Sequence, residues 1–284
     1  MMTGKPQLTG LGLTAITLAS GLIAMIAAGS AWAADTPTVD EIVNHTNLMS
    51  YFQGRDGRAR VEMTITDANG RTRARQFTLL RRDEPPTDAL KGNAYRGEQK
   101  YYVYFHRPAD VSRMVLMVWK HQNRDDDRWL YLPALDLVKR IAASDTRTSF
   151  AGSDFFYEDV SGRSIDLDTH ELVKTTDSYY VLRNRPKAPE TVEFSYYDMY
   201  VHKATFLPIE TDYFDRDGTK YRVYKVLKVE VIQGYPTATK AEMRDLKKGT
   251  VTTLSYSDAR YDVGLPDDIF TERYLRRAPR KYLR

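Results

Sequence analysis

Apolar and polar side chains alternate with a period of two through much of the chain after residue 55. Val61, Met63 and Ile65 alternate with polar residues, and a turn at 67–70 separates them from a similar segment at 71–80. This alternation is typical of strands with one buried face, and the turn predicts a hairpin. Further strands are predicted at 100–106, 113–120, 129–132, 137–141, 179–183, 191–201, 208–214, 221–232, 240–246 and 250–258.

Helical signals lie near the two ends of this strand-rich region. Thr38 and Glu41 have the spacing of a capping box, and the apolar residues that follow predict a helix from Val39 to Phe52. A short helix with an acidic cap is predicted to begin at 265–270. Closely spaced strands joined by tight turns, with few helices, predict a mainly β protein built on a single curved antiparallel sheet.

The segment 113–120 departs from the alternation, because it is apolar at every position between its two terminal cations. A strand with one face in water carries polar residues on that face, so both faces of this strand are predicted to be covered. The core covers one face of the strand, and a helix, a loop or a ligand covers the other. The alternative is that 113–120 is an ordinary central strand of a filled core. The two possible inward sets are Met114, Leu116 and Val118, or Val115, Met117 and Trp119.

Three acids follow a small-residue turn and three aromatic residues in the stretch 149–159. They are Asp154, Glu158 and Asp159. Paired carboxylates can act as general acid and base, but no histidine or nucleophile neighbours them in the sequence. The alternative is a loop whose acids cap backbone amides or pair with Lys139 and Arg140. We expect the acids to orient and cap the loop after Gly152.

The stretch from Trp129 to Val160 resembles the outer-membrane lipoprotein-sorting protein family, whose members are periplasmic proteins related to the LolA-type lipoprotein carriers. The matching residues are those of 129–135, 139–141 and 150–159. The resemblance implies an open half-barrel sheet whose concave face is covered by a few helices and holds lipid tails. It also implies that no covalent chemistry is performed, that no cofactor is needed, and that an inner-membrane exporter of the resistance-nodulation-division (RND) type hands over cargo.

A carrier of this kind needs an apolar cavity, since each buried methylene of an acyl chain contributes about 0.8 kcal/mol. Methionines suit such a surface because they adapt to cargo of different shapes. Three stripes of apolar side chains on the predicted strands are candidates for the cavity wall. Each stripe is also compatible with an ordinary filled core. The predicted lipid-binding residues are Val61, Met63, Ile65, Met114, Leu116, Val118, Trp129 and Tyr131. Two functions compete with the carrier. One is a binding module that has a filled core and acts through its rim, and the other is a hydrolase that uses the three acids.

The N-terminus has the features of an export signal. Lys5 precedes a largely apolar run, and Ala31-Trp32-Ala33 supplies the small residues that a signal peptidase requires. We expect a signal peptide at 1–33, cleaved near Ala33, and one domain at 34–284; an uncleaved membrane anchor is the alternative. The chain has no cysteine, which excludes disulfides and a lipobox, so a freely diffusing periplasmic protein is expected. A carrier needs no partner subunit to form its cavity, so we expect a monomer.

Charge excludes further classes of function. The net charge of +4 is far below the charge density of nucleic-acid binders, and the five histidines lack metal-ligand spacing. Arg71, Arg73 and Arg75 share one strand face, which fits either a phosphate or acidic partner or the solvent side of an edge strand. The basic tail at 273–284 either makes transient contact with a membrane surface or an acidic partner, or is a solvated end.

Overall fold

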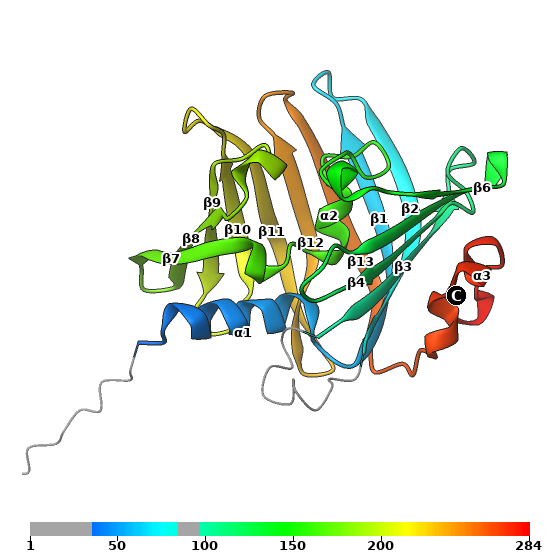
Figure 1. Cartoon of the computed structure of the whole chain (residues 1–284), viewed down its shortest axis with the longest axis horizontal. Helices are drawn as coiled ribbons and strands as arrows, with labels where there is room; N and C mark the ends of the chain where they lie inside the picture. Colours follow the sequence, from blue (N-terminus) through cyan, green and yellow to red (C-terminus); the bar gives the residue numbers. More distant parts are fainter. Residues whose placement is uncertain (1–35, 85–96) are drawn as a thin grey trace, which may run out of the picture. The chain divides into compact units, whose positions relative to one another are not determined.

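The computed structural model describes residues 36–84 and 97–284, so the predicted signal peptide and its cleavage site lie outside the described residues. Thirteen antiparallel strands in these ranges form one sheet in the order β6-β5-β4-β3-β2-β1-β13-β12-β11-β10-β9-β8-β7 (Figure 1). The sheet is not closed, because β6 and β7 are its two edges. The predicted mainly β, open half-barrel fold is confirmed. The strands are β1 (Asp56–Thr66), β2 (Thr72–Asp83), β3 (Gln99–Arg107), β4 (Val115–Lys120), β5 (Asp127–Leu132), β6 (Leu137–Arg140), β7 (Asp168–Thr175), β8 (Tyr179–Pro186), β9 (Tyr196–His202), β10 (Pro208–Phe214), β11 (Lys220–Ile232), β12 (Tyr235–Asp245) and β13 (Thr250–Tyr261).

The strand order forces one segment of the chain across the concave face. Strands β1 to β6 proceed from the middle of the sheet to one edge, and β7 to β13 return from the other edge to the middle. The connection between the edge strands, residues 141–167, therefore has to span the sheet, and Figure 1 shows it doing so in front of the central strands. We call these residues the crossing segment. It contains α2 (Tyr157–Ser161) and the 3₁₀ helices η4 (Ala143–Asp145) and η5 (Ile165–Leu167).

The N-terminal helix α1 (Val39–Tyr51) covers the β7–β8 side of the concave face (Figure 1). It begins with the predicted capping box, in which the Thr38 amide donates to Glu41 Oε2 at 2.8 Å and the Glu41 amide donates to Thr38 Oγ1 at 3.3 Å. Its apolar face packs Ile42 and Val43 against β8 and β9. The other helices are α3 (Glu272–Arg276), η3 (Pro133–Leu135), η6 (Pro189–Thr191), η7 (Asp267–Phe270) and η8 (Arg280–Tyr282).

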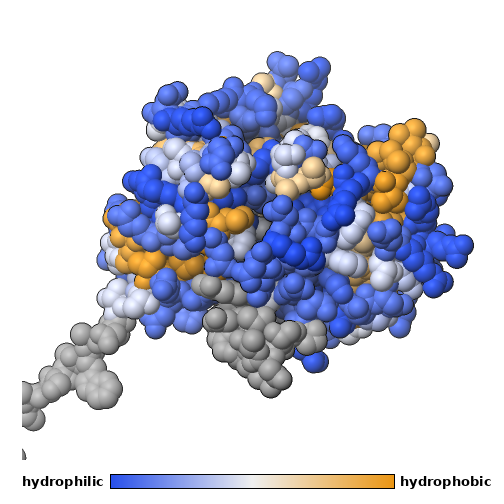
Figure 2. Space-filling view, viewed as in Figure 1, coloured by the Kyte–Doolittle hydropathy of each residue, from blue (hydrophilic) through white to orange (hydrophobic). Residues whose placement is uncertain are grey.

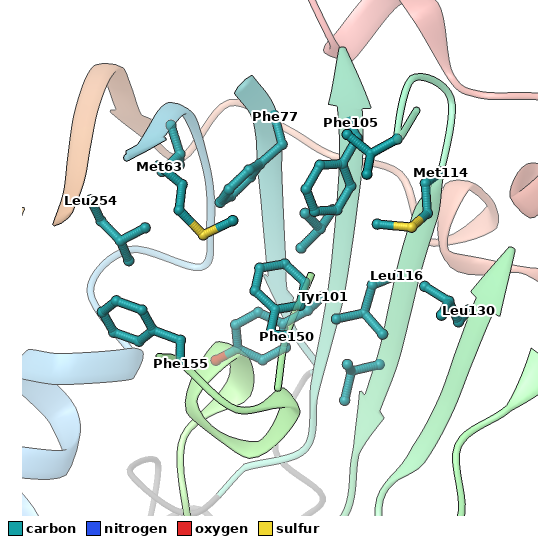
Figure 3. Close-up of a cluster of buried hydrophobic side chains, with 14 of the residues drawn as sticks. Met63, Phe77, Tyr101, Phe105, Met114, Leu116, Leu130, Phe150, Phe155 and Leu254 are labelled. Carbon is teal, nitrogen blue, oxygen red and sulfur yellow. The ribbon is translucent and has the colours of Figure 1, made fainter. Parts of the chain in front are cut away.

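Both faces of β4 are covered, as its apolar pattern predicts. Leu116 and Val118 point into the inner cluster, which the crossing segment covers with Phe150 and Phe155 (Figure 3). Alternate residues point to the outer face, which the C-terminal segment covers. This outer cluster joins Val115 and Met117 to Leu265, Ile269, Phe270, Leu275 and Leu283. The basic tail is therefore not a loose end, because its apolar residues are buried against β2 to β5.

Several local expectations are wrong. β7 was not predicted, and the predicted strand 191–201 is divided between η6 and β9. The helix predicted at 265–270 is a 3₁₀ helix that follows Pro266 and lacks an acidic cap. β2 is not an edge strand, since it pairs with β1 and β3. Arg73 and Arg75 lie on the same face as Met63 and Ile65, and Arg75 approaches Asp110 at 3.6 Å. Arg71 precedes the strand.

Within the described ranges, no helix has the length and apolar character needed to cross a membrane. Two of the exposed large apolar residues, Leu135 and Leu137, lie at the β6 edge, where Figure 2 shows an apolar patch.

Candidate ligand-binding cavity

A cavity of about 400 Å³ lies on the concave face, between α1, the crossing segment and the inner faces of β1, β2 and β8 to β13. Its volume falls within the range of about 300–1,000 Å³ that is usual for small-molecule sites. Its wall is formed by residues of the strands, of α1 and of the crossing segment. The apolar part of the wall includes Met63, Phe77, Leu182, Met199, Met243 and Leu254.

The structure separates the predicted lipid-binding residues into three groups. Met63 alone of the eight lines the cavity. Five others belong with Met63 to the inner apolar cluster but do not line the cavity, and the crossing segment packs Phe150 and Phe155 onto this cluster (Figure 3). They are Val61, Ile65, Met114, Leu116 and Val118. Trp129 and Tyr131 lie on the outer face beneath the C-terminal segment.

The cavity wall also contains residues that the sequence analysis did not identify. One face of α1 lines it with Val43, Thr46, Asn47 and Ser50, which have helical spacing. This pattern is visible in the sequence, but its polar character is typical of a solvent-facing stripe. The second half of the sheet contributes many of the other side chains. Its tyrosines on the wall are Tyr197, Tyr213, Tyr224, Tyr256 and Tyr261.

The three acids of the crossing segment fasten it to the sheet. Asp154 accepts hydrogen bonds from the hydroxyls of Thr250 and Thr252 on β13. Asp159 accepts from the Phe156 amide at 2.6 Å, and from the guanidinium of Arg222 on β11. The predicted orienting and capping contacts are therefore present.

Glu158 has a cation on each side. Arg147 Nη1 donates to its Oε1 at 2.9 Å, and Arg163 Nη1 donates to its Oε2 at 3.3 Å. The proposed pairing of the acids with Lys139 and Arg140 is wrong, because Arg140 instead pairs with Asp127 on β5. No group of three or more His, Cys, Asp or Glu residues within 36–84 and 97–284 is placed to hold a metal ion.

Lys120, at the end of β4, joins the crossing segment to the end of α1. Its buried Nζ donates to the carbonyls of Ser161 (2.9 Å) and Gly162 (3.2 Å), and lies 5.0 Å from the centre of the Tyr51 ring. Gly162 has φ +77°, and a Cβ there would lie 2.3 Å from the Tyr51 ring, so only glycine fits. Burial lowers the pKa of Lys120 from 10.5 to about 8.

This pKa predicts that the protein becomes more stable as the pH rises from 8 to 10. In that window the unfolded chain binds more protons at Lys120 than the folded chain, so the free energy of unfolding should rise by about 2 kcal/mol. Above pH 10 the gain should end, since burial raises the pKa of Tyr213 and Tyr256 to about 12 and their ionisation favours unfolding.

Urea titrations across this pH range measure the effect. Lys120→Met should lack the rise, whereas Lys174→Met, at an exposed position on β7, should keep it. Equal pH profiles for the wild type and Lys120→Met would contradict the assignment of the titrating group.

Comparisons with known proteins agree with this architecture. A family model with the description "Uncharacterized protein" matches residues 97–277, which is more than half of the chain. No curated protein gives a significant match. A DUF1329 family protein from Desulfovibrio piger is 27% identical with a TM-score of 0.74, and the alignment covers 84% of this chain and 100% of that one.

Two further solved structures are similar. A protein domain from Vibrio parahaemolyticus described as an outer membrane lipoprotein-sorting domain is 25% identical with a TM-score of 0.73, covering 84% of this chain and 97% of that one. A LolA superfamily protein from Nitrosomonas europaea is 18% identical with a TM-score of 0.64, covering 84% and 100%, which is a likeness of fold.

Proposed function

Because the chain belongs to the family matched over residues 97–277 and has the LolA-like fold of outer-membrane lipoprotein-sorting proteins, we propose that it is a carrier of hydrophobic cargo. The cargo is a lipid, the acyl chains of a lipoprotein or another hydrophobic molecule, held in the cavity between α1 and the sheet. The carrier works in the periplasm as a monomer, after cleavage of the signal peptide near Ala33. It carries out no chemical reaction.

One observation supports this proposal most strongly: the concave face is only partly filled. The crossing segment packs Phe150 and Phe155 onto β1 to β5, whereas about 400 Å³ remains open beside it. Protein interiors are close-packed, so an unfilled space of this size with an apolar wall is typical of a ligand site. Met63 is then a direct cargo contact. The other predicted residues of the inner cluster support the wall.

The remaining partners follow from the resemblance. An RND-type inner-membrane exporter hands cargo to the carrier, which then delivers it toward the outer membrane, with transient contact at membrane surfaces. The mildly basic chain has no role with nucleic acid. The three acids do not act as catalysts in this proposal, because Asp154, Glu158 and Asp159 are occupied by hydroxyl, amide and guanidinium donors.

Native mass spectrometry of periplasmic protein purified without detergent tests the proposal. The expected result is a mature chain beginning at or next to Ala34 that retains lipid-sized mass. A chain beginning at Met1 would contradict the export assignment. Protein without retained mass that also takes up no lipid from vesicles would favour a binding module that acts through its rim.

A further inference from the structure

The cavity has a band of hydroxyl groups that the fold itself does not use. Thr46 on α1 points into the cavity wall and is only 5% exposed, yet its Oγ1 has no hydrogen-bond partner in the described part of the chain. A helix that packs on a core normally turns an apolar stripe toward it. Here the stripe that faces the cavity contains Thr46, Asn47 and Ser50, and of its two hydroxyls that of Ser50 is used by the helix, since it donates to the Thr46 carbonyl at 2.7 Å. A buried hydroxyl without a partner is unfavourable unless a ligand or water satisfies it.

Tyrosines add to this band. Seven tyrosines line the cavity, and three of them have hydroxyls that hydrogen-bond within the protein. Tyr101 donates to Gln99 (2.9 Å), Tyr197 to Asp168 (2.8 Å) and Tyr261 to Gln53 (2.9 Å). The other four make no such hydroxyl bond to residues of 36–84 or 97–284. They are Tyr51, Tyr213, Tyr224 and Tyr256.

These four side chains form one group rather than scattered positions. Tyr51 ends α1, and the other three are on β10, β11 and β13. Each of Tyr51, Tyr213 and Tyr256 is close enough to Tyr224 to raise its pKa, together with burial, which is the larger cause. Tyr51 is held in place by Gly162 and by the ammonium of Lys120. Hydroxyl donors thus approach the cavity from both the helix and the sheet.

The chemistry of this band selects a neutral hydrogen-bond acceptor. Each hydroxyl can donate one hydrogen bond, and a saturated hydrocarbon offers no acceptor. The two acids beside the tyrosines are already paired, since Glu158 lies between Arg147 and Arg163, and Asp159 pairs with Arg222. Arg58 and Arg260 also line the cavity, on β1 and β13. The hydroxyls of the band carry no charge themselves and therefore fit an uncharged carbonyl oxygen.

We propose that the cavity holds a lipid by its acyl carbonyls, with ester or amide oxygens accepting hydrogen bonds from Thr46, Tyr51, Tyr224 and Tyr256. The proposal rests on the carrier function and adds to it the class of cargo, which is acyl lipid rather than hydrocarbon or ether-linked lipid. The chains on either side of the carbonyls contact the apolar wall that includes Met63, Met243 and Leu254.

Matched vesicles distinguish carbonyl recognition from apolar binding. The full-length mature protein is incubated with vesicles of a diacyl phosphatidylcholine or of the dialkyl ether analogue with equal chains, and the lipid bound after separation is quantified by mass spectrometry. The ester lipid should bind about tenfold more tightly, as expected for one or two net hydrogen bonds. The Tyr51→Phe/Tyr224→Phe variant keeps Thr46 and Tyr256 and should show a clearly smaller preference for the ester lipid, while its affinity for the ether lipid stays that of the wild type.

A control variant removes a hydroxyl elsewhere. Tyr196→Phe changes a tyrosine outside the cavity that stacks on Phe214, and it should keep the tenfold preference. Equal binding of both lipids by the wild type would overturn the carbonyl proposal and leave the carrier function standing. Binding of neither lipid would overturn both. An ester preference in the double variant as large as that of the wild type would overturn the assignment to Tyr51 and Tyr224. The comparison of the two lipids on the wild type does not depend on the folding of any variant.

Discussion

Ala59→Trp is expected to remove retained lipid almost completely and to leave the melting temperature within a few degrees of the wild type. Ala59 is on the inner face of β1, pairs with Leu79 on β2, and lines the cavity together with it. An indole ring at this position occupies volume that no protein atom fills, so cargo is excluded and little strain arises. Calorimetry and mass spectrometry of the detergent-free protein measure the two quantities.

Leu116→Trp is the matched control, because Leu116 lies on the same side of the sheet but is fully buried in the closed inner cluster. Overpacking a filled core costs about 1–3 kcal/mol. For a domain of this size that corresponds to a fall of about 2–12 °C in melting temperature. An equal loss of stability in both variants would show that the space beside Ala59 is filled in solution and would contradict the cavity.

Arg222→Met is expected to lower the free energy of unfolding by about 3–5 kcal/mol, since removal of one partner leaves a buried charge uncompensated. Arg222 is 2% exposed and lies between Asp159, the Asp154 carbonyl (2.9 Å) and the ring of Phe156, whose centre is 4.1 Å from the guanidinium carbon. It is the main ionic link from β11 to the crossing segment. Retained lipid should fall as well, because that segment forms one wall of the cavity.

Urea unfolding of two further variants isolates the buried pair. Arg60→Met breaks a pair with Asp258 in which the two side chains are 50% and 58% exposed, and it should cost less than about 1 kcal/mol. Arg222→Met/Asp159→Leu should be less destabilised than Arg222→Met alone, because no unpaired carboxylate remains. If the free energy of unfolding of Arg222→Met were no lower than that of Arg60→Met, the crossing segment would be held by packing alone.

The amino-acid pattern by itself determined the local elements of this protein. Period-two alternation around Met63 identifies β1, and the spacing of Thr38 and Glu41 identifies the start of α1. The apolar run in β4 also shows that both of its faces are covered. These features depend on neighbours in sequence, because side chains alternate across a strand and a cap reaches only one helical turn.

Only the tertiary structure decided which inner-face positions border open space. Met63 and Leu116 are both apolar strand positions on the same side of the sheet, yet Met63 reaches the cavity and Leu116 lies in the part of the inner cluster that the crossing segment covers. That difference arises because the edges β6 and β7 are joined across the concave face, and Phe150 then fills one part of it. Contacts between residues so distant in sequence leave no periodic signal, so the position of the cavity follows from the topology of the folded chain.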